Sequence, residues 1–396
     1  MTEFIMHFET QLSNIMGKGF DSGQLKRTLL YILAPILRLP TINKLCSVFK
    51  LDKNSMYESL AALNEGQWLK LLRLFAYARV FTVIRKNQEL HPSNQSRNRI
   101  TIGTDDSAMA KSGKKMPLVS TIWMGALKKL GIGTQLLYFF VVIGEQKHCF
   151  PLDLRLCRGR KGRRGRATKS KNQLVVEMMH DFHQALLSEG LPTTQIVFVA
   201  DAWFNAPDIY QAARACGFSL VIRGKKSYGF TIDGERVKAA ELAARRNHWR
   251  TSAKDGGRYA RYAAVHDTFG QVILTFYRLN GKVVYLISTN PDHSSPKIIH
   301  DFELRWSVEV CFKDCKQNLF IDKCSMRDRA EIFGHYVLRT LAYHLMGWIR
   351  VKMFKRKKTI GQCCDWLYYC VLIHPSPNED KLGLHKLKSY LPDFKY

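Results

Sequence analysis

The stretch Asp301–Lys316, DFELRWSVEVCFKDCK, governs how the rest of the chain is interpreted. Read as a helix with about 100° between successive residues, it places Arg305 and Lys316 within roughly 40° of Glu309. Phe302 lies on the same face. A carboxylate thus shares one helix face with two cations and an aromatic ring. Because Arg305 and Glu309 are i,i+4 neighbours, an ordinary amphipathic helix with an ion pair explains the same pattern.

Composition narrows the class of partner. The 396 residues include 61 Lys and Arg against 33 Asp and Glu, a formal net charge of +28, and 46% are hydrophobic. A globular protein with this excess of positive charge predicts a polyanionic partner, and nucleic acid fits better than an anionic membrane. No apolar run approaches the roughly 20 residues of a membrane helix, and the N-terminus lacks the pattern of a signal peptide. We therefore expect a cytoplasmic protein without a membrane partner.

The N-terminal region is predicted to be helical. A helix over Thr41–Phe49, a turn over Leu51–Asn54 and a following helix capped by Ser55 together resemble a helix-turn-helix. A small helical bundle with no role in DNA binding explains the same spacing. A polar, turn-rich linker over His91–Asn98 marks the first expected domain boundary.

Carboxylates stand at the ends of two apolar β-type runs. Arg99–Asp106 alternates and ends on two acids, and Gln195–Asp201 ends on one. Strands are also predicted over Val119–Ala126 and Gln135–Ile143. A meander of three strands followed by a crossover would bring the fourth strand beside the first. Because ligand sites of α/β sheets collect at the carboxyl ends of strands, we expect these acids to lie together.

Asp105, Asp201 and Glu309 are accordingly the candidate metal ligands and catalytic residues, with Asp106 as the alternative to Asp105. Clustered carboxylates repel one another and favour a bound cation, and oxygen ligands suit Mg²⁺ or Mn²⁺. Two such ions about 3.5–4 Å apart can support cleavage of a phosphodiester. Taken singly, each acid fits a solvated strand end just as well.

A basic segment over Arg155–Lys171 is interrupted by glycines and has no apolar period. We expect it to form a mobile loop that contacts phosphates. Its candidate DNA-binding residues are Arg158, Arg160, Lys161, Arg163, Arg164 and Arg166.

Later in the chain, hairpin strands are predicted over Tyr259–His266, Gln271–Leu279 and Lys282–Thr289, followed by a long helix over Arg327–Arg350. The ten cysteines are scattered, which argues against a disulfide framework. Three of them near one histidine could suggest zinc, but their spacing matches no common zinc module. These are Cys311, Cys315 and Cys324, with His335.

With these residues, the chain resembles bacterial insertion-sequence transposases of the DDE type, and more narrowly the group that their nomenclature numbers four. The mark of that group is Tyr-(2)-Arg-(3)-Glu-(6)-Lys. The residues that match it with every spacing kept are Phe302, in the Tyr position, Arg305, Glu309 and Lys316.

The two aspartates resemble the same family. Asp105 with Ser107 is similar to its Asp-x-Thr, and Val199–Phe204 is similar to the surroundings of its second acid. The resemblance implies metal binding and catalysis by the three acids. Phe302, Arg305 and Lys316 are expected to contact DNA.

The resemblance also implies the fold: a mixed α/β, RNase H-like sheet with helices, interrupted by a β-rich insertion domain and preceded by a helical domain. The expected domains are 1–95 (helical, DNA-binding), 96–224 (first part of the catalytic core), 225–295 (β-rich insertion), 296–350 (second part of the core, with the Glu309 helix) and 351–396 (C-terminal helical segment).

The function that it implies is a transposase that cleaves transposon ends and joins them to target DNA by two-metal phosphoryl transfer. The partners would be double-stranded DNA, as terminal inverted repeats and target, and a second copy in a homodimeric DNA complex associated with the nucleoid. The alternatives are a domesticated DNA-binding relative that does not cut, and a host RNase H-like nuclease.

Overall fold

The computed structural model describes residues 2–17, 21–111, 116–125, 128–144, 148–157, 169–193, 195–246 and 248–372. Its strands are β1 (Ile100–Ala110), β2 (Ser120–Met124), β3 (Lys129–Ile143), β4 (Phe150–Cys157), β5 (Ile196–Ala200), β6 (Ser219–Gly224), β7 (Gly229–Ile232), β8 (Glu235–Lys238), β9 (Arg250–Thr251), β10 (Arg258–His266), β11 (Gly270–Leu279) and β12 (Lys282–Ser288).

The helices are α1 (Thr2–Met16), α2 (Ser22–Leu33), α3 (Ile42–Phe49), α4 (Lys53–Ala61), α5 (Glu65–Leu90), α6 (Gln95–Asn98), α7 (Lys171–Ser188), α8 (Pro207–Ala215), α9 (Ala239–Arg245), α10 (Ser295–Leu304), α11 (Trp306–Gln317), α12 (Arg329–Phe354) and α13 (Ile360–Leu372). The predicted mixed α/β class is confirmed. No helix in the described ranges is long and apolar enough to cross a membrane.

The described strands join in one mixed sheet, in the order β2-β3-β1-β5-β6-β12-β11-β10-β7-β8, with β4 on β3 and β9 on β10. At its centre β1 is antiparallel to β3 and parallel to β5, and β5 is parallel to β6. The strand predicted fourth, β5, thus lies beside the first, as the meander and crossover required.

One strand at the edge of β3 differs from the sequence-based expectation. The basic loop was expected to begin at Arg155, but this residue lies in β4, which pairs with β3 as far as Cys157. The strand carries a proline and a fully buried acid, Asp153, which obscured its apolar pattern. Asp153 is tolerated because the guanidinium of Arg155 donates to its Oδ1.

The sheet is covered on both faces, and β3 shows why. Its even-numbered apolar residues, such as Tyr138, pack with α11 and α12, whereas its odd-numbered ones, such as Phe139, pack with α7, α8 and the second half of α5. Side chains of a strand alternate between faces, so a long apolar run is expected for a strand buried on both sides. The Tyr138 ring stacks on Phe312 of α11 with ring centroids 4.7 Å apart, and this contact holds α11 against the sheet.

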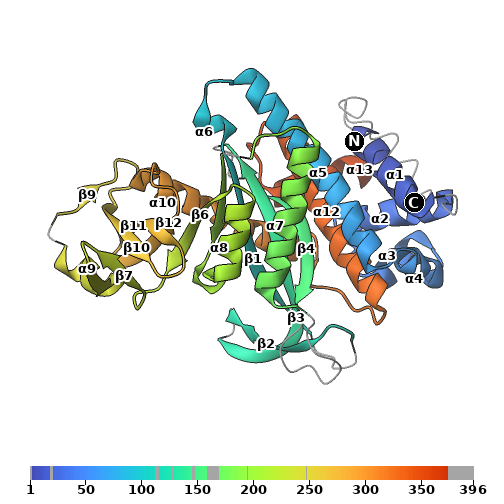
Figure 1. Cartoon of the computed structure of the whole chain (residues 1–396). Helices are drawn as coiled ribbons and strands as arrows, with labels where there is room; N and C mark the ends of the chain where they lie inside the picture. The colour runs from blue at the N-terminus through green and yellow to red at the C-terminus, as the bar shows by residue number, and fades with distance from the viewer. Residues whose placement is uncertain are drawn as a thin grey trace.

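The N-terminal helices pack around α12, at the opposite side of the central strands from the β-rich part (Figure 1). The hydroxyl of Tyr31 in α2 is hydrogen-bonded to Nδ1 of His335 at 2.7 Å, and Arg339 donates to the Tyr31 carbonyl at 3.0 Å. Helix α4 begins earlier than expected, because Asp52 rather than Ser55 is its N-cap. Whether α3 and α4 bind DNA stays a prediction.

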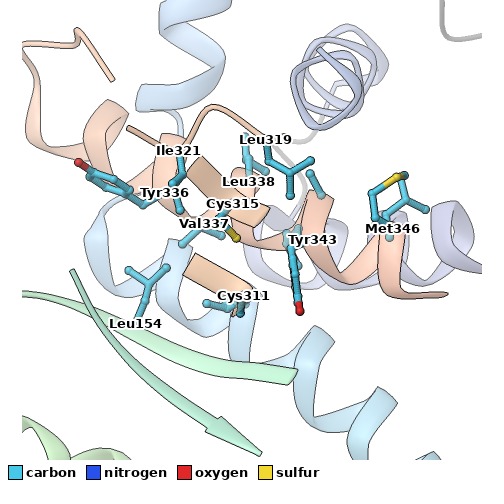
Figure 2. Packing of buried hydrophobic residues seen from close by; sticks show 14 of the residues in the cluster. Leu154, Cys311, Cys315, Leu319, Ile321, Tyr336, Val337, Leu338, Tyr343 and Met346 are labelled. Carbon is cyan, nitrogen blue, oxygen red and sulfur yellow. The ribbon is translucent and has the colours of Figure 1, made fainter. Parts of the chain in front are cut away.

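Figure 2 shows the core between α11 and α12, where Cys311 and Cys315 pack among apolar side chains that include Leu319 and Val337. Each nitrogen of the buried His335 ring has a partner, since Nε2 lies 2.9 Å from the Ile321 carbonyl. The cysteines of this region are free and buried, as expected for small apolar core residues.

The β-rich segment extends the central sheet. Strand β12 pairs antiparallel with β6, from Ser288 opposite Val221 to Tyr285 opposite Gly224, and β11, β10, β7 and β8 follow outward (Figure 1). Backbone hydrogen bonds therefore run from the core strands into residues 225–295. The division of the chain at the expected domain boundaries stays a prediction.

Candidate active site

The first two acids lie on neighbouring parallel strands. The β1–β5 register ends with Gly103 opposite Val199, so Asp105 and Asp201 stand two residues beyond the same point of the ladder. Gly103 permits this close approach: a Cβ there would lie 2.5 Å from the Val199 carbonyl oxygen and 2.7 Å from the Phe140 ring. Asp201 also caps the short 3₁₀ turn that follows, since its Oδ1 accepts from the Trp203 backbone N–H at 2.8 Å.

Asp105 and Asp106 point to opposite faces of β1. The strand was expected to end at these acids, but it continues to Ala110, so the alternation of a strand separates the two side chains. Asp105 faces α11, and Asp106 accepts from Gln135 and forms an ion pair with Lys171 at the start of α7. The face toward α11 therefore carries Asp105.

The third acid is carried by α11. The stretch expected to be one helix is two, because the chain tightens at Arg305, where the Arg305 N–H bonds to the Phe302 carbonyl at 3.1 Å. Arg305 keeps right-handed helical torsions, so its side chain still reaches Glu309 one turn later, with Nη2 to Oε1 at 2.8 Å. The Phe302 ring lies 5.5 Å from the guanidinium.

Arg305 connects two of the acids. Its Nη1 lies 2.6 Å from Asp105 Oδ2 while its Nη2 holds Glu309. This guanidinium occupies the position between two carboxylates from elements about 200 residues apart in sequence. Its Nε is buried and has no hydrogen-bond partner among the described residues.

Lys316 contacts the sheet. Its Nζ donates to the Ser107 hydroxyl at 2.7 Å and to the Ala108 carbonyl at 3.1 Å. Burial lowers the pKa of this amine. In this structure Lys316 ties the last turn of α11 to β1, directly beyond Asp105.

The three acids line one cavity of about 520 Å³ together with Arg305 and Lys316, and Asp106 lies on its wall as well. Sequence analysis missed a further cation on its wall, the exposed Lys313. Its position four residues after Glu309, on the same helix face, is the signal that could have identified it.

Burial dominates the electrostatics of Asp105. It raises the pKa of this carboxyl to about 6, against the opposing effect of Arg305, and the neighbouring Asp106 and Asp201 raise it further. A cation closer to the acids would favour the ionised form.

The donor set of the cavity fits a hard divalent cation, because carboxylate oxygens are the ligands that Mg²⁺ and Mn²⁺ take. As they stand, no three His, Cys, Asp or Glu side chains in the described ranges are grouped closely enough to hold a metal. Arg305 holds the position between Asp105 and Glu309, so a metal ion would need this side chain to move.

The remaining candidate residues, Arg158, Arg160, Lys161, Arg163, Arg164 and Arg166, lie outside the described residues. Lys171, at the end of the expected loop, is described, and its ammonium lies 5.3 Å from the centre of the Trp203 ring. It links the far face of β1 to the turn after Asp201.

The fold and the cavity together define a mixed α/β protein with acidic residues and cations gathered at the ends of parallel strands. Residues 166–345 match the family model of the transposase DDE domain. The match includes Asp201 and Glu309, begins after Asp105, and supports a DDE transposase. No curated protein matches the chain.

Proposed function

We propose that the chain is a DNA transposase that cleaves the ends of a mobile element and joins the freed 3′-hydroxyl ends to target DNA. The observation that carries this proposal is the convergence of Asp105, Asp201 and Glu309 in one cavity whose other charged wall residues include cations. The match to the transposase DDE domain supports the same reaction class.

In this proposal the three carboxylates hold Mg²⁺, or Mn²⁺ in its place. Bound divalent ions would activate water and stabilise the charge that develops on the phosphate during cleavage. Asp105 and Asp201 are fixed by the β1–β5 ladder, and Glu309 is fixed by the packing of α11 on the sheet.

Arg305 would have one role before DNA binds and another in the DNA complex. In the structure it neutralises Asp105 and Glu309 and leaves its Nε without a partner in the described residues. We propose that it turns toward a DNA phosphate when the substrate arrives, because a phosphate accepts the bidentate pairing that a guanidinium offers. Phe302, which lies against the guanidinium, would limit the range of this movement.

Lys316 and Lys313 would have separate tasks. Lys316 positions the end of α11 against β1 through Ser107 and Ala108, so its loss should misplace Glu309. Lys313 is exposed on the cavity wall and is free to approach a phosphate from solvent.

The DNA would be double-stranded and would comprise the terminal inverted repeats and the target, bound by a homodimer. The excess of 61 Lys and Arg over 33 Asp and Glu supports a long polyanionic partner. A second copy would supply a second cavity, so that the two ends could be held and cleaved in one complex.

The test uses linear DNA that includes the sequences flanking the coding region, with nicking and binding measured separately. Glu309→Gln should retain DNA binding and lose Mg²⁺-dependent nicking. Glu303→Gln is the matched control, since Glu303 pairs with Lys254 at the surface of α10 and should leave nicking intact. Nicking by Glu309→Gln at the rate of the unmodified protein would overturn the proposal.

A further inference from the structure

A second basic cavity lies in the β-rich part of the molecule, at the N-terminus of α10. It has a volume of about 600 Å³ and is lined by three arginines, Arg246, Arg250 and Arg261, together with Asp292. Three guanidiniums and one carboxylate give this cavity a net positive charge. In this it differs from the cavity at the other end of α10, which is lined by the acids.

Two of its arginines are held in place by the fold. Arg246 donates from Nε to the His248 carbonyl at 2.8 Å and lies 5.2 Å from the centre of the Tyr262 ring, and Arg261 donates from Nη2 to the Pro291 carbonyl at 2.8 Å. Each guanidinium has five N–H donors, so several remain for a ligand. Groups that are already oriented lose little conformational entropy when a ligand binds.

The third arginine is uncommitted. Within the described residues the guanidinium of the exposed Arg250 makes no hydrogen bond or ion pair, although it lines the same cavity. The first turn of α10 adds the positive end of a helix of ten residues, capped by Ser294. Tyr259 contributes an aromatic wall.

These features together select a phosphate. A planar guanidinium pairs with two phosphate oxygens at once, and an aromatic ring beside it can contact a sugar or base. A DNA backbone is the phosphate source that the placement favours, because α10 leads from this cavity to Arg305 at the acid cavity.

We propose that this cavity binds a backbone phosphate of the DNA whose cleavage is proposed above, and on that function the inference rests. Ten residues of helix span about 15 Å at 1.5 Å per residue. At about 3.4 Å per base pair the bound phosphate would therefore lie about four base pairs from the phosphodiester in the acid cavity. The β-rich segment would thus set how the DNA lies across the sheet.

The experiment measures binding of the full chain to a labelled DNA duplex of about 30 base pairs, without Mg²⁺, across a range of salt concentrations. The Arg250→Ala/Arg261→Ala variant should weaken binding about tenfold and lower the slope of log affinity against log salt by about one, because the slope counts neutralised phosphates and one phosphate contact is lost.

The matched control is Arg236→Ala/Arg245→Ala, which removes the same charge from the same segment. These arginines pair with the exposed acids Asp267 and Glu235, away from the cavity. The control should keep the slope of the unmodified protein. Equal losses in both double variants would show that only net charge matters, and the cavity would have no role.

Two further arms make the outcome decisive. The single variant Arg250→Ala should weaken binding more than the control does and less than the double variant does, and it removes no contact that holds the fold together. Calorimetry with inorganic phosphate tests the other source: phosphate binding that is lost in the double variant while DNA binding is unchanged would assign the cavity to a free anion and overturn the proposal.

Failure of this proposal can be distinguished from failure of the proposed function, because binding is measured without cleavage. If the protein nicks DNA but the cavity variants bind like the control, only the proposal of the second phosphate site is rejected. If the salt slopes are as expected but the protein never nicks DNA, the phosphate site is supported and the proposed transposase activity is rejected.

Discussion

Two carboxylates of this protein have nearly the same chemistry and opposite surroundings. Burial raises the pKa of both Asp105 and Asp301 to about 6, and one arginine opposes the shift in each case, Arg305 for Asp105 and Arg99 for Asp301. The ion-pair distances are 2.6 Å and 2.9 Å. The perturbed pKa alone does not separate a site from a structural ion pair.

Solvent access distinguishes Asp105 from Asp301. The side chain of Asp105 is 16% exposed and opens into a cavity with three other acids, whereas that of Asp301 is 0% exposed and joins α10 to the start of β1. A buried pair with no cavity can only stabilise or destabilise the fold, but a pair at a cavity wall can exchange its partner for a ligand. The arginine at the cavity also has a buried Nε without a hydrogen-bond partner in the described residues.

The largest expected difference is in cleavage. Asp105→Asn should lower Mg²⁺-dependent nicking by a factor on the order of 10³ or more, because it removes a proposed metal ligand while the fold is kept. Asp301→Asn should nick DNA in proportion to its folded fraction. Nicking assays together with circular dichroism give the nicking rate per folded molecule. Equal losses of this rate in Asp105→Asn and Asp301→Asn would contradict the different roles given to the two acids. Asp106→Asn tests the choice between adjacent acids and should retain activity.

The next difference is in stability. Arg99→Met should lower the free energy of unfolding by about 3–5 kcal/mol, because it removes the ion-pair partner of the fully buried Asp301. Arg305→Met should cost less, since water and cations reach Asp105 through the cavity. Urea unfolding of both variants at neutral pH measures this, and equal costs would contradict the role given to access.

A smaller difference is expected in the pH dependence of stability. Folding raises the pKa of Asp301 from 3.8 to about 6, so between these values the folded state holds a proton that the unfolded chain has released. This contribution is favourable below about pH 4, declines as the pH rises to about 6, and is lost above it, on the order of 1–3 kcal/mol in all. Urea titrations at several pH values should show a flatter profile for Asp301→Asn.

The smallest effect concerns Mg²⁺ and stability. A cation that binds only the folded protein should raise the free energy of unfolding by about 1.4 kcal/mol at ten times its dissociation constant. The increase should disappear in Glu309→Gln and persist in Asp301→Asn. Melting curves with and without MgCl₂ test this, and an equal increase in all three proteins would indicate binding elsewhere.

The sequence predicted the neighbourhood of the acids better than their contacts. The apolar runs before Asp105 and Asp201 identified two strands, because a strand is indicated by short-range periodicity. The crossover between them implied that the two strands are adjacent. The spacing of Arg305 and Glu309 likewise follows from helical geometry, which the tightened turn at Arg305 alters only locally.

What the sequence could not provide were pairings across long separations. The contact of Arg305 with Asp105, and that of Lys316 with Ser107, depend on how α11 packs against β1. Lys171 and Asp106 meet for a similar reason, on the opposite face. Strand β4 was missed because its buried acid is stabilised by Arg73 on α5 as well as by its own strand. Such partners are set by tertiary packing, and no local pattern records them.

The acid cavity depends on Gly103, a residue that is not on its wall. A single added methyl group would press on the Val199 carbonyl and the Phe140 ring and push β5 from β1 just before the two aspartates diverge from the ladder. All three acids and both neighbouring cations would remain in the sequence, and every motif would still be intact. A copy of this gene that keeps all three acids could therefore still lose the proposed activity through a change at Gly103.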